Sequence, residues 1–133
     1  SFRFFNVYGP RLNTKGQYGA VFGNFLKQKK SKRPLTVVGD GKQTRDFIHV
    51  NDLIDAFLKV IKTPLVDKVY NLGSGKETSI NKIASLFGGK RIFIPKRPGE
   101  AKRSCANINK IKGDIKWRPK IYISKGINKL LSS

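Results

Sequence analysis

Apolar residues along the chain fall into short blocks and helical stripes. Residues 2–7 and 69–72 form two apolar blocks that end in the turn residues Tyr8-Gly9-Pro10 and Gly73-Ser74-Gly75, and they predict two strands. Neither block has an alternating polar face, which is typical of strands inside a parallel sheet covered on both sides. The chain has too few strands to build such a sheet, so we expect the missing strands upstream of Ser1.

The rest of the pattern alternates helices with further strands. Apolar blocks at 35–38 and 91–94 predict strands, and another apolar block covers 47–50. Helical stripes predict helices at 18–28, 53–61, 80–87, 107–112 and up to residue 131, with Asn51, Ser79 and Ser124 as N-caps of three of them. This order of elements predicts a mixed α/β fold without an internal repeat.

Length, composition and charge limit the class of protein. With 133 residues, of which 38% are hydrophobic, the chain is long enough for one domain with its own core and is not a disordered polar chain. No uninterrupted apolar stretch reaches the ~18–20 residues that a membrane-spanning helix needs. The net charge of +20 suggests nucleic acid or an anionic membrane as a partner. Because the lysines are scattered and Ile and Asn are also abundant, we favour a composition bias spread over the whole surface.

Cysteine and histidine are scarce. Cys105 is the only cysteine and His49 the only histidine, so a disulfide framework, a Cys-clustered zinc site and a His-dependent triad are not expected. The chain has no initiator Met, and no charged segment followed by an apolar one marks a signal peptide. We expect a piece of a longer cytoplasmic protein, with which a lone cysteine agrees.

Two polar loops carry the residue types that bind phosphate. Gly39-Asp40-Gly41 precedes Arg45 and Asp46, and glycines allow close backbone approach while the Arg guanidinium presents a fork of donors. Arg97-Pro98-Gly99-Glu100 is expected to place a cation and a carboxylate on the same side of a bend, where they can meet phosphate and sugar hydroxyls. An ordinary hairpin with a surface ion pair and a solvated loop are the alternatives to these two interpretations.

Other candidates for chemistry are weaker. Gly73-Ser74-Gly75 follows a strand but lacks the further glycine of a dinucleotide fingerprint and the Lys-Ser/Thr of a P-loop, so a tight strand-to-helix turn is the simpler interpretation. His49 and Trp117 are expected in the core or a turn. No pair of carboxylates suits acid–base catalysis, and no Ser-x-x-x-Tyr-x-x-x-Lys arrangement occurs. The chain therefore offers anion-binding parts without an evident catalyst.

Four sequence motifs occur in a fixed order. They are FFNVYGPR at 4–11, LTVVGDGKQTRDFIHVND at 35–52, YNLGSG at 70–75 and RPGE at 97–100. A weaker match covers 107–119, where Asn107-Ile108-Asn109 replaces the usual Asp-x-Ser. Together the motifs resemble the NAD-dependent epimerase/dehydratase family, the extended short-chain dehydrogenases that act on nucleotide sugars. The resemblance spans nearly the whole chain, and it is more specific for the family than for the substrate.

The resemblance implies a fold and a division of labour. Residues 1–133 would be the C-terminal, substrate-binding part of such an enzyme, with a few strands that belong to a Rossmann sheet. The N-terminal NAD-binding part, with its glycine-rich loop and Tyr-x-x-x-Lys pair, would be absent. In this family NAD transiently oxidises the sugar; epimerases return the hydride to the other face, and dehydratases first lose water. The chain alone is therefore expected to be inactive, and the full-length enzyme to be a homodimer.

The resemblance also implies binding roles for individual positions. Phe5 would lie near the nicotinamide of NAD, Asn6 would contact the sugar diphosphate, and Gly19 and Ala20 would begin the helix that lines the substrate. Thr36, Val37 and Val38 would meet the base through backbone groups, Arg45 would bind the diphosphate, Phe47 would lie by the ribose, and Arg97 and Glu100 would clamp phosphate and ribose from the other side. No catalytic residue and no metal ligand is implied within the chain.

These inferences favour one function and leave two alternatives. We expect the nucleotide-sugar-binding part of a cytoplasmic UDP-sugar 4-epimerase in polysaccharide biosynthesis, which binds neither nucleic acid nor membrane. The first alternative is a dTDP-sugar 4,6-dehydratase, because the catalytic acid and base that separate the two enzymes are not in the chain. The second is a non-catalytic basic module that binds anions or nucleic acid, which the charge of +20 motivates.

Overall fold

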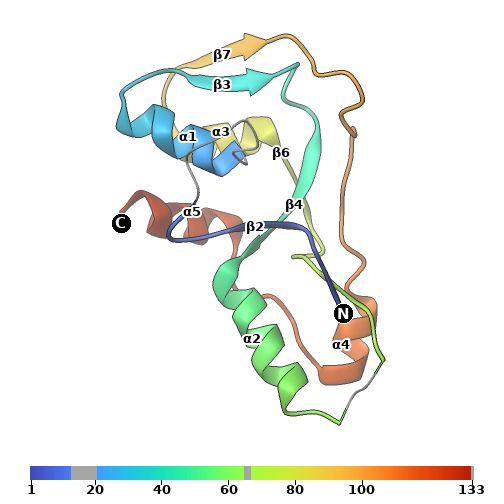
Figure 1. Cartoon of the computed structure of the whole chain (residues 1–133). Helices are drawn as coiled ribbons and strands as arrows, with labels where there is room; N and C mark the ends of the chain where they lie inside the picture. Colours follow the sequence, from blue (N-terminus) through green and yellow to red (C-terminus); the bar gives the residue numbers. More distant parts are fainter. Residues whose placement is uncertain (13–20, 65–66, 133) are drawn as a thin grey trace.

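The structure is a computed structural model, and it describes residues 1–12, 21–64 and 67–132. Within these ranges the chain forms a mixed α/β fold (Figure 1). Its elements, in chain order, are β1 (Phe2–Phe4), β2 (Asn6–Tyr8), α1 (Val21–Lys30), β3 (Leu35–Val38), β4 (Thr44–His49), α2 (Val50–Ile61), β5 (Tyr70–Leu72), β6 (Glu77–Ser79), α3 (Ile80–Phe87), β7 (Arg91–Ile94), α4 (Asn109–Ile115) and α5 (Ile123–Leu131).

Three short ladders connect the strands. β1 pairs in parallel with β5, so the first part of the apolar block at 2–7 lies beside the block at 69–72. β2 pairs in parallel with β4, and β4 pairs antiparallel with β6 at its other end. β3 and β7 form a separate parallel pair, which lies above α1 and α3 in Figure 1. β4 runs from this upper layer towards α2 and so links the two halves of the molecule.

Two hydrophobic clusters fill the two halves. The first lies between α1, α3, α5 and β3, and its fully buried side chains include Phe22, Phe25, Val37, Ile83 and Phe87. The second lies beneath β1, β5 and α2, and it is centred on Trp117, Ile48, Tyr70 and Leu72. Buried and half-buried residues alternate along β3. One face of this strand therefore packs on the first cluster, and the other face is available for a site.

Several expected elements are confirmed and others are wrong. The strands at 35–38 and 91–94 and the helix at 80–87 have the expected bounds, and the Ser79 side chain accepts a hydrogen bond from the Lys82 amide as an N-cap should. The cap of α2 is His49 rather than Asn51, because His49 Nδ1 accepts from the Asn51 amide at 3.1 Å. Ser124 is also not a cap, since α5 begins one residue earlier, at Ile123.

Further corrections concern strands and helix bounds. The block at 2–7 is interrupted at Phe5 and gives two strands that pair with different partners. β4 and β6 are strands that the apolar pattern does not predict, because most of their residues are polar, although four of the six residues of β4 are buried. α4 covers Asn109–Ile115 rather than 107–112, and α1 is described only from Val21 onwards.

A buried carboxylate fixes the C-terminal segment to α2. Both oxygens of Asp52 accept backbone amides, from Lys120 and Ile121, each at 3.0 Å. Trp117 Nε1 in turn donates to the Asp52 carbonyl. These bonds pin the segment before α5 to the first turn of α2, so Asp52 has a structural role. None of the helices in the described ranges is both long and apolar enough to cross a membrane.

Candidate functional site

A cavity of about 470 Å³ lies where α1, β3, β4 and the loop around Arg97 meet. It brings together most of the binding residues expected from the sequence, from segments up to 94 positions apart. Those that line it are Asn6, Thr36, Val38, Arg45, Phe47, Arg97 and Glu100. Arg45 and Arg97, the arginines of the two predicted phosphate-binding loops, therefore face a single cavity, here called the central cavity, whereas Gly39 and Asp40 do not line it.

Arg45 is held rigidly at the wall of the central cavity. Its Nη1 donates to the carbonyls of Thr44 and Ala101, each at 2.8 Å, and its Nη2 contacts Glu100 Oε1 at 3.1 Å. Only 18% of the Arg45 side chain and 26% of the Glu100 side chain are exposed. The guanidinium thus has a fixed position before any ligand binds, which reduces the entropic cost of binding an anion.

Arg97 gives the central cavity its excess positive charge. Glu100 already balances the charge of Arg45, whereas Arg97 forms no ion pair with a described residue. Gly99 adopts a positive φ of 72°, which a glycine tolerates and which forms the bend between Arg97 and Glu100. One ion pair and one further cation therefore face the same space, an arrangement that suits a ligand with a compact negative charge.

The free edge of β3 provides backbone groups for a flat ligand. The amides of Leu35 and Gly39 donate to the chain around β7, so those of Thr36 and Val38 point to the opposite edge. On that edge Gln28 binds both the amide and the hydroxyl of Thr36, and Gln43 Nε2 donates to the Val38 carbonyl at 2.9 Å. The Thr36 carbonyl and the Val38 amide on the same edge are thus positioned beside the central cavity.

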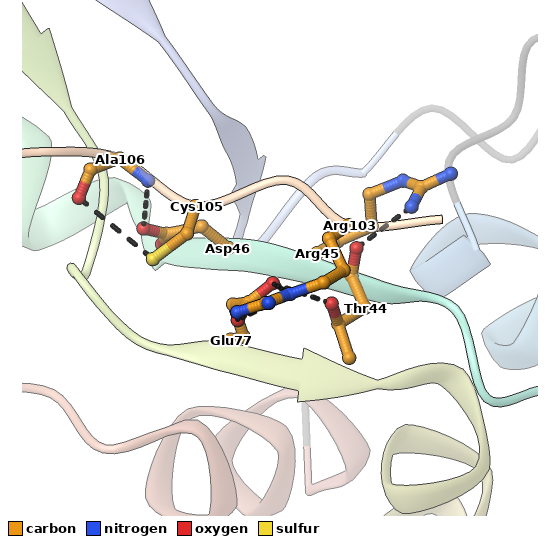
Figure 2. A network of polar contacts seen from close by, with 7 residues as sticks. All are labelled: Thr44, Arg45, Asp46, Glu77, Arg103, Cys105 and Ala106. Atoms are coloured by element: carbon orange, nitrogen blue, oxygen red, sulfur yellow. Dashed lines mark hydrogen bonds and ion pairs between the residues drawn. The ribbon is translucent and has the colours of Figure 1, made fainter. Parts of the chain in front are cut away.

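Asp46 occupies the glycine loop that the sequence offers as a weak phosphate site. It is fully buried, and its Oδ1 accepts from the amide and hydroxyl of Ser74 at 2.6 and 2.7 Å. Its Oδ2 accepts from the Gly75 amide at 2.9 Å and from the Ala106 amide at 3.0 Å, and Figure 2 shows the bond from Ala106. The anion-binding groups of this loop are therefore taken by the protein's own carboxylate, and Asp46 does not orient Arg45.

A second ion pair fixes the segment beside β4. Glu77 on β6 accepts from Arg103 Nη2 at 2.6 Å and from the Thr44 hydroxyl at 2.7 Å (Figure 2). The hydrogen bond from Arg103, together with that from Thr44, lowers the pKa of Glu77 from 4.5 to about 2. This network holds residues 101–106 against β4 and β6.

Some expected site residues do not reach the central cavity. The Val37 side chain is fully buried in the first hydrophobic cluster, and its backbone points towards β7 rather than to the free edge. Phe5 packs partly buried against the second cluster and does not line the cavity. Gly19 and Ala20 lie outside the described residues.

Neither His49 nor Cys105 is placed for an evident chemical role. His49 is buried edge-on against the Tyr8 ring, and burial lowers its pKa, with a smaller opposite effect from Asp52 and a further lowering from Lys129. Cys105 is exposed, and partial burial of its sulfur with nearby acids raises the pKa of its thiol. In the ranges that the structure describes, no cluster of His, Cys, Asp or Glu could hold a metal ion.

The sequence interpretation missed the amides that line the central cavity. Asn24, Gln28 and Gln43 contribute to its wall. The first two share a face of α1 with Val21 and Phe25, at spacings of three and four residues. Polar side chains on the apolar stripe of a predicted helix were the signal that could have identified them.

Comparisons with known proteins identify the family of the chain. The model of the "NAD dependent epimerase/dehydratase family" matches residues 1–73. UDP-glucuronic acid decarboxylase 1 of Arabidopsis thaliana is 34% identical over 98% of this chain and 31% of its own length, and a UDP-glucose 4-epimerase of Mycolicibacterium smegmatis is 31% identical over 93% and 41%.

A solved structure shows the same fold. UDP-glucose 4-epimerase of Thermotoga maritima, determined with UDP-glucose, superimposes with a TM-score of 0.90 at 26% identity, over 98% of this chain and 44% of that chain. The chain thus spans less than half the length of these relatives, and its α/β fold is that of a portion of an extended short-chain dehydrogenase. On the evidence of its motifs, its fold and these matches, the chain belongs to the NAD-dependent epimerase/dehydratase family.

Proposed function

We propose that this chain is the nucleotide-sugar-binding part of an NAD-dependent nucleotide-sugar enzyme, and that its ligand is a UDP-sugar. The observation that carries the proposal is the convergence of Arg45, Arg97 and Glu100 on the central cavity beside the free edge of β3. Two guanidinium groups suit a diphosphate, because each can donate two hydrogen bonds to phosphate oxygens. The named ligand of the Thermotoga relative, UDP-glucose, has this chemistry.

The arrangement suggests how each part of the nucleotide is bound. The diphosphate lies between Arg45 and Arg97, and the ribose lies by Phe47 and Glu100. The base lies along β3, where the Thr36 carbonyl and the adjacent Val38 amide can pair with the donor and an acceptor on a pyrimidine edge. Gln28 and Gln43 keep this edge in place by occupying its other groups.

Glu100 gives a physical reason to prefer UDP over dTDP. Uracil and thymine present the same hydrogen-bonding edge to β3, so the base alone does not separate them. A carboxylate accepts from both hydroxyls of a ribose, whereas a deoxyribose offers only one. A nucleotide that leaves part of the desolvated carboxylate without a donor binds less tightly.

The reaction of the full-length enzyme depends on parts that this chain lacks. Its sequence contains neither a glycine-rich dinucleotide fingerprint nor a Tyr-x-x-x-Lys pair, and the amides of its Gly73-Ser74-Gly75 loop are occupied by Asp46. The described residues therefore do not fit NAD by themselves, and we infer that another part of the enzyme binds it. A 4-epimerase is our first choice; a decarboxylase of UDP-glucuronic acid is a second candidate, because a relative of that name is 34% identical.

Calorimetric titrations of the purified chain with UDP, UDP-glucose, dTDP-glucose and a DNA duplex test the proposal. We expect UDP and UDP-glucose to bind with similar affinity, dTDP-glucose to bind more weakly, and DNA not to compete. Tight DNA binding with a steep salt dependence and no effect of UDP-glucose would instead support the basic-module alternative.

Substitution of Arg97 locates the site. Arg97→Ala is expected to weaken UDP-glucose binding about ten- to a hundredfold, since charge-assisted bonds contribute about 1.5–3 kcal/mol each. Arg91→Ala is the matched control: the substitution removes the same charge, and Arg91 lies on β7 outside the central cavity. Equal affinities of the Arg97→Ala variant and the parent would refute the assignment of this cavity.

Arg45→Lys tests whether the guanidinium group of Arg45, and not only its charge, is needed for binding. Arg45→Lys is also expected to lose affinity, because an ammonium group cannot reproduce the three bonds of the fork. The same change releases the Ala101 carbonyl, so it should lower stability as well. Urea unfolding measured beside the titration separates the two effects.

A further inference from the structure

A second cavity of about 510 Å³ adjoins the central cavity. Its walls are the loop that contains Gly39 and Asp40 and the segment from Lys96 to Arg103. Val38, Gln43 and Glu100 line both cavities and form the partition between them. The proposed nucleotide leaves this second cavity free, because the diphosphate, ribose and base are all placed on the other side of the partition.

Positive charge dominates the second cavity. Lys42, Lys96, Lys102 and Arg103 line it, against the two carboxylates of Asp40 and Glu100. Arg103 is paired with Glu77, which lies outside the cavity, and Glu100 is paired with Arg45. The three lysines form no ion pair with any residue in the described ranges. Against these three cations stands the single carboxylate of Asp40, so an excess of two positive charges faces one space and raises its positive potential.

The segments that carry these lysines are held in place. The Thr44 amide donates to the Lys102 carbonyl at 3.0 Å, and the adjacent Arg103 binds Glu77 (Figure 2). The aliphatic stem of Lys96 lies over Gly39, where an added Cβ would come within 3.6 Å of Lys96 Cγ. The Asp40 carboxylate accepts from the Lys42 amide and so closes the turn. Hydrogen bonds thus tie the backbone that carries these exposed lysines to its neighbours.

We propose that the second cavity is a separate binding site for a phosphate-bearing anion. Ammonium groups from Lys42, Lys96 and Lys102 would surround the anion as point charges, which is how lysine binds phosphate. The volume is within the range of about 300–1,000 Å³ that ligand sites occupy, and it accommodates a pyrophosphate or a phosphate monoester.

The partition couples the two sites. An anion in the second cavity lies near the Glu100–Arg45 pair and lowers the positive potential that attracts the diphosphate. It should therefore weaken UDP binding by about two- to fivefold, since like charges on opposite sides of the partition repel only modestly through a largely aqueous setting. UDP must weaken binding of the anion by the same factor, because coupling between two binding sites is reciprocal.

Pyrophosphate titrations in the presence of saturating UDP test this proposal. Under these conditions the central cavity is filled, and we expect one further pyrophosphate to bind. The variant with Lys42→Gln, Lys96→Gln and Lys102→Gln should bind pyrophosphate with at least tenfold lower affinity and should still bind UDP. The control variant with Lys30→Gln, Lys62→Gln and Lys68→Gln loses the same charge at exposed positions outside both cavities, and it should bind pyrophosphate like the parent.

The outcomes separate this site from the central cavity. Arg97→Ala should weaken UDP binding and leave the second pyrophosphate site intact, which supports two distinct sites. If pyrophosphate binds only when UDP is absent, or if both triple-lysine variants weaken it equally, the second cavity is not a site and the charge acts non-specifically. Circular dichroism of each variant shows whether a loss of binding comes from a loss of fold.

Discussion

Asp46→Asn is the substitution whose effect the structure defines most sharply. The carboxylate of Asp46 is fully buried and accepts four hydrogen bonds, two on each oxygen. Asparagine has nearly the same shape but keeps only one oxygen. Its amide nitrogen would face either the N–H groups of Gly75 and Ala106 or the amide and hydroxyl of Ser74. The backbone N–H groups on that side would lose their acceptor, and two bonds to the carboxylate would be lost in either orientation.

The expected loss is large compared with the stability of a domain of this size. Two charge-assisted bonds disappear, and each contributes about 1.5–3 kcal/mol, because the buried donors are left without partners. We therefore expect the free energy of unfolding to fall by about 3–5 kcal/mol, out of the ~5–15 kcal/mol typical of a domain. In urea this corresponds to a midpoint lower by about 1.5–2.5 M for a slope of ~2 kcal/mol/M.

Urea unfolding followed by tryptophan fluorescence measures this loss, since Trp117 is fully buried. Asp40→Asn is the matched control: it removes the same charge from an exposed carboxylate that, among the described residues, accepts only the Lys42 amide, and it should cost less than about 1 kcal/mol. Ser74→Ala removes one of the four bonds and should lie between the two. A loss below 1 kcal/mol for Asp46→Asn would show that the four bonds do not hold the loop as argued.

Three further predictions follow from particular contacts. Because the folded-state pKa of Glu77 is lowered to about 2, its ion pair adds stability above pH 4.5 that is lost as the pH falls towards 2; Arg103→Gln should flatten this part of a stability–pH curve measured by urea unfolding. The buried Tyr8 hydroxyl has no hydrogen-bond partner among the described residues, so Tyr8→Phe should leave thermal stability unchanged or raise it. Gly126→Ala should instead lower stability by about 1–3 kcal/mol, because the added Cβ would collide with the Tyr8 hydroxyl and ring. The purified chain with added NAD should epimerise no UDP-glucose in a coupled assay, because neither the NAD-binding loop nor the Tyr/Lys pair is present; turnover proportional to chain concentration would contradict this.

Local sequence determined those elements whose residues agree on one structure. β3, α3 and β7 have the bounds that their apolar pattern predicts, and Ser79 caps α3 as its position before an amphipathic stripe requires. The residue types at Arg45, Arg97 and Glu100 also indicated phosphate and sugar hydroxyls without any structure. These features depend on backbone periodicity and side-chain chemistry, which a sequence contains in full.

Only the tertiary structure decided where the polar groups are used. β4 and β6 form strands although many of their residues are polar, because pairing partners distant in the sequence satisfy their backbone groups. The same folding turned Asp46 away from Arg45 and into the Gly73-Ser74-Gly75 loop, and gave Glu100 to Arg45 as its partner. Which carboxylate meets which donor depends on contacts 28 to 60 positions apart, and no local pattern specifies such contacts.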